Sequence, residues 1–112
     1  MKKINLLFKQ GFDSTNKPEF IAFAKKFKNA IKKEIGLVKG ELTAYRVGHF
    51  ELSGFFRVRS HCYYFSFGDV RWGTGQLLWR RAKDEQDFTG GQNEYAALKD
   101  GMFEELREFQ ID

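Results

Sequence analysis

The stretch HFELSGFFRVR (residues 49–59) decides the fold, because its apolar and polar side chains alternate with the two-residue period of a β-strand. One face of the predicted strand carries Phe50, Leu52, Phe56 and Val58, and the other carries His49, Glu51, Ser53, Phe55, Arg57 and Arg59. A glycine inside a strand indicates a bulge or a closely packed neighbour, and Gly54 predicts one of these here.

Three further segments, residues 41–47, 62–67 and 77–82, are predicted strands of the same sheet. Their short connections require antiparallel neighbours, so the sequence predicts a meander of about four strands. Residues 84–93 form a polar, glycine-bearing loop, and residues 95–98 fit either a short strand or an extra turn.

Helical periodicity appears on both sides of the predicted strands. Near the N-terminus, Asn16 is a candidate cap and Gly36 a candidate end. The apolar stripe between them comprises Phe20, Phe23, Ala24, Phe27, Ala30, Ile31 and Ile35. A second helix is predicted from Asp100, with Met102, Phe103, Leu106 and Phe109 as its stripe. Both helices are expected to cover one face of the sheet, which gives a two-layer α+β fold in a single domain, residues 1–112.

The composition favours a binding protein over an enzyme. Cys62 is the one cysteine, so neither a disulfide nor a usual zinc ligand set can be built, and no cofactor or metal is expected. His49 and His61 lie near opposite ends of one predicted strand, so no catalytic residues are assigned. The N-terminal apolar run is too short for an export signal or a membrane span, which predicts a cytoplasmic location without membrane contact.

The charge is divided unevenly along the chain. Residues 1–83 hold 17 basic and six acidic residues, net +11, whereas residues 84–112 hold two basic and nine acidic residues, net −7. Basic surface favours anionic partners. The acidic part can either fold back on the basic part or face a separate basic partner.

Aromatic and arginine side chains are predicted to share the sheet face opposite the helices. Such a face suits single-stranded DNA or RNA, because rings stack on bases and guanidinium groups hold phosphates. The candidate nucleic-acid-binding residues are Lys25, Lys28, Lys32, Arg46, Phe55, Arg57, Arg59, Tyr64, Arg80 and Arg81. The alternative is a second small core, in which the aromatic residues are covered by the loop and the acidic tail.

Residues 54–56, 63–71, 78–83 and 87–93 together resemble a group of short uncharacterised proteins encoded by phages and conjugative elements of bacteria. The resemblance spans about residues 47–95 and brings no catalytic residues with it. It implies a mobile-element protein that binds DNA or RNA, or one that blocks a host defence such as a CRISPR nuclease.

Two other functions stay open. A protein-binding inhibitor of the anti-CRISPR type would contact a host nucleic-acid-handling protein through Trp72, Trp79, Glu104, Glu105 and Glu108, since aromatic anchors dominate such interfaces. A small hydrolase or nuclease would need a metal or a His–acid pair, and the sequence shows neither. Exposed edge strands would also allow a sheet-extended homodimer.

Overall fold

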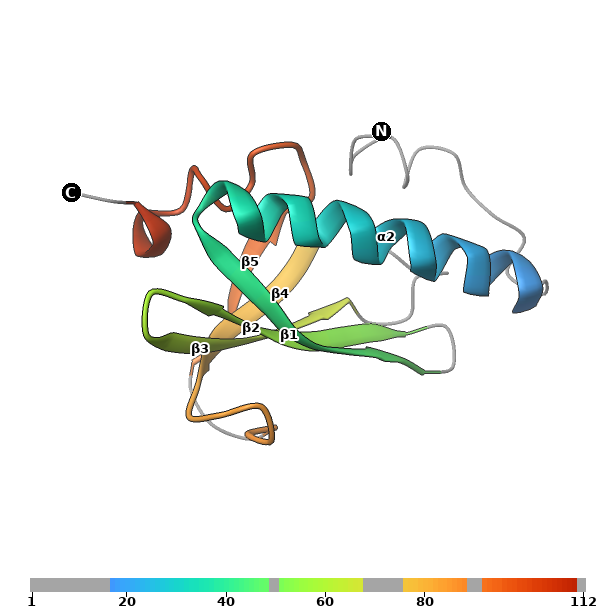
Figure 1. Ribbon diagram of the computed structural model, residues 1–112, viewed down its shortest axis with the longest axis horizontal. Coiled ribbons are helices and arrows are strands. Elements are labelled where there is room, and N and C mark those ends of the chain that lie inside the picture. Colours follow the sequence, from blue (N-terminus) through green and yellow to red (C-terminus); the bar gives the residue numbers. More distant parts are fainter. Residues whose placement is uncertain (1–16, 49–50, 68–75, 89–91, 111–112) are drawn as a thin grey trace.

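The computed structural model describes residues 17–48, 51–67, 76–88 and 92–110. In this part of the chain one long helix lies across a five-stranded sheet (Figure 1). The elements in chain order are α2 (Lys17–Leu37), β1 (Gly40–Val47), β2 (Leu52–Val58), β3 (His61–Phe67), β4 (Gln76–Ala82), β5 (Glu94–Ala97) and the short 3-10 helix η2 (Arg107–Phe109).

The sheet is an antiparallel meander in the order β1-β2-β3-β4-β5. The predicted α+β class and meander are therefore confirmed, whereas the predicted number of strands was too low. Residues 95–98, which fitted either a strand or a turn, fall largely within β5, where Ala97 pairs with Gln76 of β4.

The main core lies between α2 and one face of the sheet. The predicted apolar stripe of α2 is buried there, with Phe27 and Ile31 fully inaccessible. From the sheet, Phe56, Tyr63 and Phe65 meet it from neighbouring strands. The helical period in the sequence thus identified the buried side of α2 correctly.

The predicted C-terminal helix is wrong. Residues 100–105 form successive turns, and only η2 is helical in the described part of this segment. Gly101 has a φ of 78°, in the left-handed region, and Leu106 is extended, so a continuous helix is broken at both points. Met102, Phe103 and Phe109 are nevertheless buried in the main core, so the apolar residues cover the predicted face without helical geometry.

Glu34 of α2 holds this irregular segment in place. Its buried carboxylate accepts hydrogen bonds from the backbone N–H groups of Gly101 and Met102, at 2.8 and 3.1 Å. Burial raises the pKa of Glu34. Since the carboxylate satisfies two backbone donors, it stabilises the turn that begins at Gly101.

The end of α2 also differs from the sequence prediction. Gly36 lies within the helix, and Lys39, with a φ of 60°, adopts the left-handed conformation just beyond it. The backbone N–H of Lys39 donates to the carbonyl of Gly36 at 3.0 Å. Asn16, the predicted cap, lies outside the described residues.

Gly54 is required by close packing between strands. A Cβ atom there would lie 2.2 Å from the backbone oxygen of Ala44 and 2.8 Å from the ring of Phe65. The bulge that Gly54 suggested is found in the facing strand, where the register shifts between Leu42 and Ala44. Of the two predicted explanations for this glycine, close approach is the one that applies to its own strand.

We predict that alanine substitutions at two glycines change the free energy of unfolding in opposite directions. Gly54→Ala should lower the free energy of unfolding by at least about 3 kcal/mol or prevent folding, since backbone on the facing strand cannot yield. Gly36→Ala, the matched control inside α2 with no atom within 4 Å, should raise it by about 0.5–1 kcal/mol. Urea unfolding measures both, and a G54A variant with the parental midpoint would contradict the packing described.

Candidate nucleic-acid interface

The sheet face turned away from α2, here called the outer face, carries the predicted aromatic and arginine side chains. Phe55 of β2 pairs in register with Tyr64 of β3, and Tyr64 pairs with Arg80 of β4. The ring centroids of Phe55 and Tyr64 are 5.2 Å apart, and the Arg80 guanidinium lies 4.7 Å from the Tyr64 centroid. The structure therefore brings these three residues together on the outer face.

A loop after β4 covers this outer face. We call residues 83–88 the acidic strap, and Figure 1 shows this orange loop on the side of the sheet opposite α2. Phe88 of the strap meets Phe55 and Tyr64 edge-on, with centroid distances of 5.3 and 6.1 Å. Phe55 is only 1% exposed as a result. Its ring has no surface on which a base could stack.

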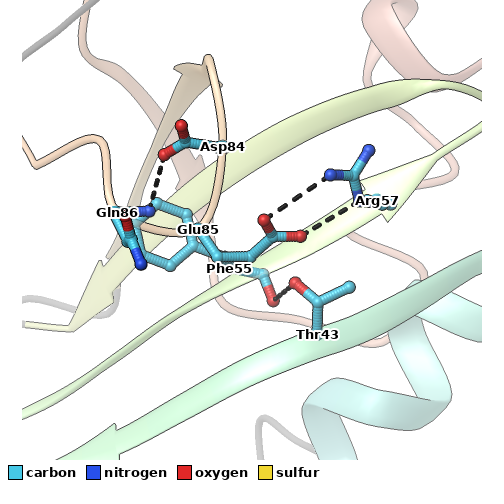
Figure 2. A network of polar contacts seen from close by, with 6 residues as sticks. All are labelled: Thr43, Phe55, Arg57, Asp84, Glu85 and Gln86. Carbon is cyan, nitrogen blue, oxygen red and sulfur yellow. Dashed lines mark hydrogen bonds and ion pairs between the residues drawn. The ribbon is translucent and has the colours of Figure 1, made fainter.

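Glu85 ties the strap to β2 at one side of the outer face (Figure 2). Its carboxylate accepts from the Nε of Arg57 at 3.0 Å and from Nη2 at 3.5 Å. The hydrogen bond from Arg57 lowers the pKa of Glu85. Within the strap, Asp84 accepts the backbone N–H of Gln86 at 2.8 Å, which closes the turn.

Arg80 anchors the other side of the strap from below. It is 3% exposed, and its Nη2 donates to the carbonyl of Asp87 at 2.6 Å. Its Nη1 lies 3.8 Å from the Asp87 carboxylate, which also accepts the backbone N–H of Lys83 at 2.9 Å. Arg80 is thus a buried cation with internal partners, and it is not available to hold phosphate.

The sequence left two alternatives for this face, a surface for nucleic acid or a second small core. The described residues form the second small core. The acidic part of the chain folds back on the basic part at Glu85 and Asp87, and the aromatic rings lie between them. Tyr64 is half-buried and Arg57 is exposed but paired. The outer face is therefore covered by the chain itself.

The predicted helical cations lie elsewhere. Lys25, Lys28 and Lys32, which we call the lysine row, are all exposed on α2 and follow the i, i+3, i+7 spacing of one helix line. Lys28 lies 5.8 Å from the ring of Tyr45, which places the row on the β1 side of the helix. Within the described residues, no carboxylate forms an ion pair with any of the three.

Arg46 lies apart from the row, on the outer face of β1. It pairs in register with Ser53, and its exposed guanidinium lies 4.9 Å from the Phe88 centroid. It flanks the acidic strap at the edge of the sheet, where β1 has one strand neighbour in the described structure. Arg46 is the predicted outer-face cation that keeps an exposed position without a described carboxylate partner.

Arg59 and Arg81 contact the C-terminal segment and not the strap. Arg59 donates to the carbonyls of Glu108 and Gln110, at 2.9 and 3.5 Å. Arg81 bonds the Glu108 carboxylate through Nε at 2.8 Å, and the Tyr63 hydroxyl donates to the same oxygen at 2.7 Å. This places Arg59 and Arg81 on the helix side of the sheet.

The shared carboxylate changes the titration of its partners. Burial acts to raise the pKa of Glu108, but the hydrogen bonds from Tyr63 and Arg81 outweigh it, and the pKa falls below the usual value. Burial and the bond to Glu108 raise the pKa of Tyr63 to about 12. Glu108 is therefore a charged internal acceptor at neutral pH.

The residues assigned to the alternative, protein-binding function include both buried and exposed side chains. Trp79 is 7% exposed on the helix side of the sheet, with its ring 5.2 Å from that of Phe109, so it is no surface anchor. Glu104 and Glu105 are exposed, and Glu105 pairs with Lys99 at 2.6 Å. Trp72 lies outside the described residues.

Sequence reasoning missed three contributors to these sites. Glu85 and Phe88 of the strap were assigned only to a polar loop, and Arg107 beside Glu108 was not assigned to a site. The uneven charge distribution was the signal for the strap, since it required an acidic part close to a basic one. No sequence signal placed η2 against Arg59 and Arg81, because that contact depends on the turn at Gly101.

Other chemistry finds little support in the described residues. They contain no cluster of three or more His, Cys, Asp or Glu side chains that could hold a metal ion. Burial raises the pKa of the Cys62 thiol, which disfavours the thiolate form. His49 lies outside the described residues, and no described helix is both long and apolar enough to cross a membrane.

Comparison with known proteins found no matching family model, no matching curated protein and no matching solved structure. The resemblance to proteins of phages and conjugative elements stays a prediction. Functional inference for this chain therefore depends on its own residues.

We predict that replacing two arginines that contact the strap has unequal effects on the free energy of unfolding. Arg80→Met should lower the free energy of unfolding by about 3 kcal/mol, because it removes the buried donor to the Asp87 carbonyl and the positive charge beside the Asp87 carboxylate. Arg57→Met, a matched change at the exposed pair with Glu85, should leave the urea midpoint nearly unchanged. Equal small effects at both positions would show that Arg80 does not hold the strap.

Proposed function

We propose that the protein is a non-enzymatic module that binds the phosphate backbone of nucleic acid through the lysine row of α2. The observation that carries the proposal is the exposure of Lys25, Lys28 and Lys32 on one helix line, without a described carboxylate partner. Elsewhere in the described fold, Arg57, Arg80 and Arg81 are engaged by acids of the same chain. The row is the largest group of predicted cations left for an external anion.

The rigidity of α2 supports this use of its lysines. The opposite side of the helix is fixed in the main core by Phe27 and Ile31, and the Tyr45 hydroxyl donates to the Ala24 carbonyl at 2.9 Å. From Lys25 to Lys32 the helix rises about 10 Å. That length is about three times the rise along the duplex axis per phosphate of one DNA strand, which is about 3.4 Å.

The covered outer face changes the kind of recognition that we propose. With Phe55 buried and Phe88, itself 46% exposed, packed over Tyr64, the Phe55 ring that favoured stacking of single strands is internal. Lysine–phosphate contacts position a protein on nucleic acid without reading bases. We therefore propose backbone binding of weak sequence preference, to single strands and duplexes alike, for a protein whose predicted context is a mobile element.

Salt-dependent binding tests the lysine row directly. Neutralising two phosphate contacts with Lys28→Gln and Lys32→Gln should reduce the slope of log binding constant against log salt by about two units. The matched control is Lys26→Gln with Lys33→Gln, which removes the same charge from the other flank of α2. Fluorescence anisotropy with labelled single-stranded DNA, duplex DNA and RNA measures both pairs.

Two results would contradict the proposal. The first is absence of binding by the parental protein at low salt. The second is an equal loss in K28Q/K32Q and K26Q/K33Q, which would indicate attraction by net charge alone and no particular face. Circular dichroism of the four-lysine series checks that α2 stays helical, since Gln and Lys have similar helix propensities.

A further inference from the structure

A basic cleft lies where the β2–β3 turn, the end of β4 and η2 meet. Its volume is about 500 Å³. It is lined by Arg59, His61, Arg81, Arg107, Glu108 and Gln110. None of these six residues belongs to the lysine row, the strap or the main core, so the cleft is a separate feature of the described surface.

Arg59 is fixed in the cleft without being neutralised. It follows the last residue of β2 in a two-residue connection and has a φ of 57°. That conformation costs an L-residue about 1–2 kcal/mol, and a glycine would adopt it without strain. Its guanidinium is oriented by two backbone carbonyls of the C-terminal segment, which accept hydrogen bonds but carry no net charge.

Arg81 is neutralised by Glu108 but keeps unused donors. The carboxylate accepts from Nε, and the Tyr63 hydroxyl is a second side-chain hydrogen-bond neighbour of the same guanidinium. A guanidinium offers five N–H donors in a planar fork, so the outer side of Arg81 can still hold an oxyanion. The Tyr63 hydroxyl fixes the same carboxylate from the core side and keeps the pair in place.

Charge balance identifies the ligand class. Arg59, Arg81 and Arg107 bring three positive charges and Glu108 one negative charge, and within the described residues no other carboxylate pairs with Arg59 or Arg107. The cleft therefore has a surplus of two positive charges. A phosphate monoester carries about −1.5 to −2 at pH 7, whereas a phosphodiester or a carboxylate carries −1.

From this match we infer that the basic cleft binds a phosphate monoester group. The inference goes beyond backbone binding by the lysine row and does not depend on it. The group can be the terminal phosphate of a nucleic-acid strand or part of a small phosphorylated molecule, and both present the same dianionic oxygens to the arginine forks.

The test is a titration of the isotope-labelled protein, followed by two-dimensional NMR at constant ionic strength and pH 7. The probes are inorganic phosphate, phenyl phosphate as a monoester and dimethyl phosphate as a diester. Inorganic phosphate and phenyl phosphate should give saturable shifts at Arg59, His61 and Gln110, and dimethyl phosphate should give none at the same concentration. Arg107→Gln should weaken the binding about tenfold, as expected for loss of a charge-assisted hydrogen bond.

The matched control is Arg46→Gln, which removes one exposed arginine from the outer face and should leave phosphate binding unchanged. The inference is overturned if phosphate causes no saturable shifts in the cleft, if dimethyl phosphate binds equally well, or if R107Q has no effect. These outcomes involve no nucleic acid, so they are distinguishable from a failure of the lysine row.

A second arm identifies the source of the phosphate. Short oligonucleotides of one sequence, with and without a 5′-phosphate, are compared in anisotropy. Tighter binding of the phosphorylated strand, abolished by R107Q and retained in K28Q/K32Q, assigns the cleft to strand ends. Equal binding of both strands, together with cleft shifts from inorganic phosphate, assigns it to a small phosphorylated molecule.

Discussion

Phe55 and Phe56 are neighbours in β2, so their rings lie on opposite faces of the sheet, and both faces must be kept from water. Phe56 is covered by α2 and the C-terminal segment, with its ring 5.2 Å from that of Phe103. Phe55 is covered by Phe88 of the acidic strap. Because β2 carries a large ring on each face, both faces of the sheet need a cover. The strap after β4 supplies the cover on the outer face.

The electrostatic consequence is that most sheet arginines have internal partners. The strap supplies carboxylates to Arg57 and Arg80, and η2 supplies one to Arg81. A count of arginines on predicted strands therefore overstates the surface available to an external anion. Among the candidate cations, those that form no described ion pair with a carboxylate are the lysine row on α2, Arg46 and Arg59, and the exposed Arg107 forms none either.

Elements with a strong period could be predicted from the sequence, and those fixed by distant contacts could not. The apolar stripe of α2 and the alternation of β2 and β3 carry their own signal, and both were predicted correctly. The segment from Asp100 has a helical stripe, but the left-handed Gly101 and the extended Leu106 interrupt it, and Glu34 from across the fold binds the turn that results. Strand alternation alone predicted that Phe55 lies on the outer face. Its burial depends on Phe88, and the loop that carries Phe88 has no sequence periodicity that could have predicted this contact.

The central proposal is that nucleic acid binds the lysine row while the strap stays packed over Phe55 and Tyr64. Mapping backbone amide shifts of the labelled protein during titration with a short single-stranded DNA tests it most directly. The account predicts shifts along α2 around Lys25, Lys28 and Lys32, with Phe55, Tyr64 and the strap unchanged. Shifts centred on Phe55 and Tyr64, with release of Phe88, would show that nucleic acid displaces the strap and would contradict the account.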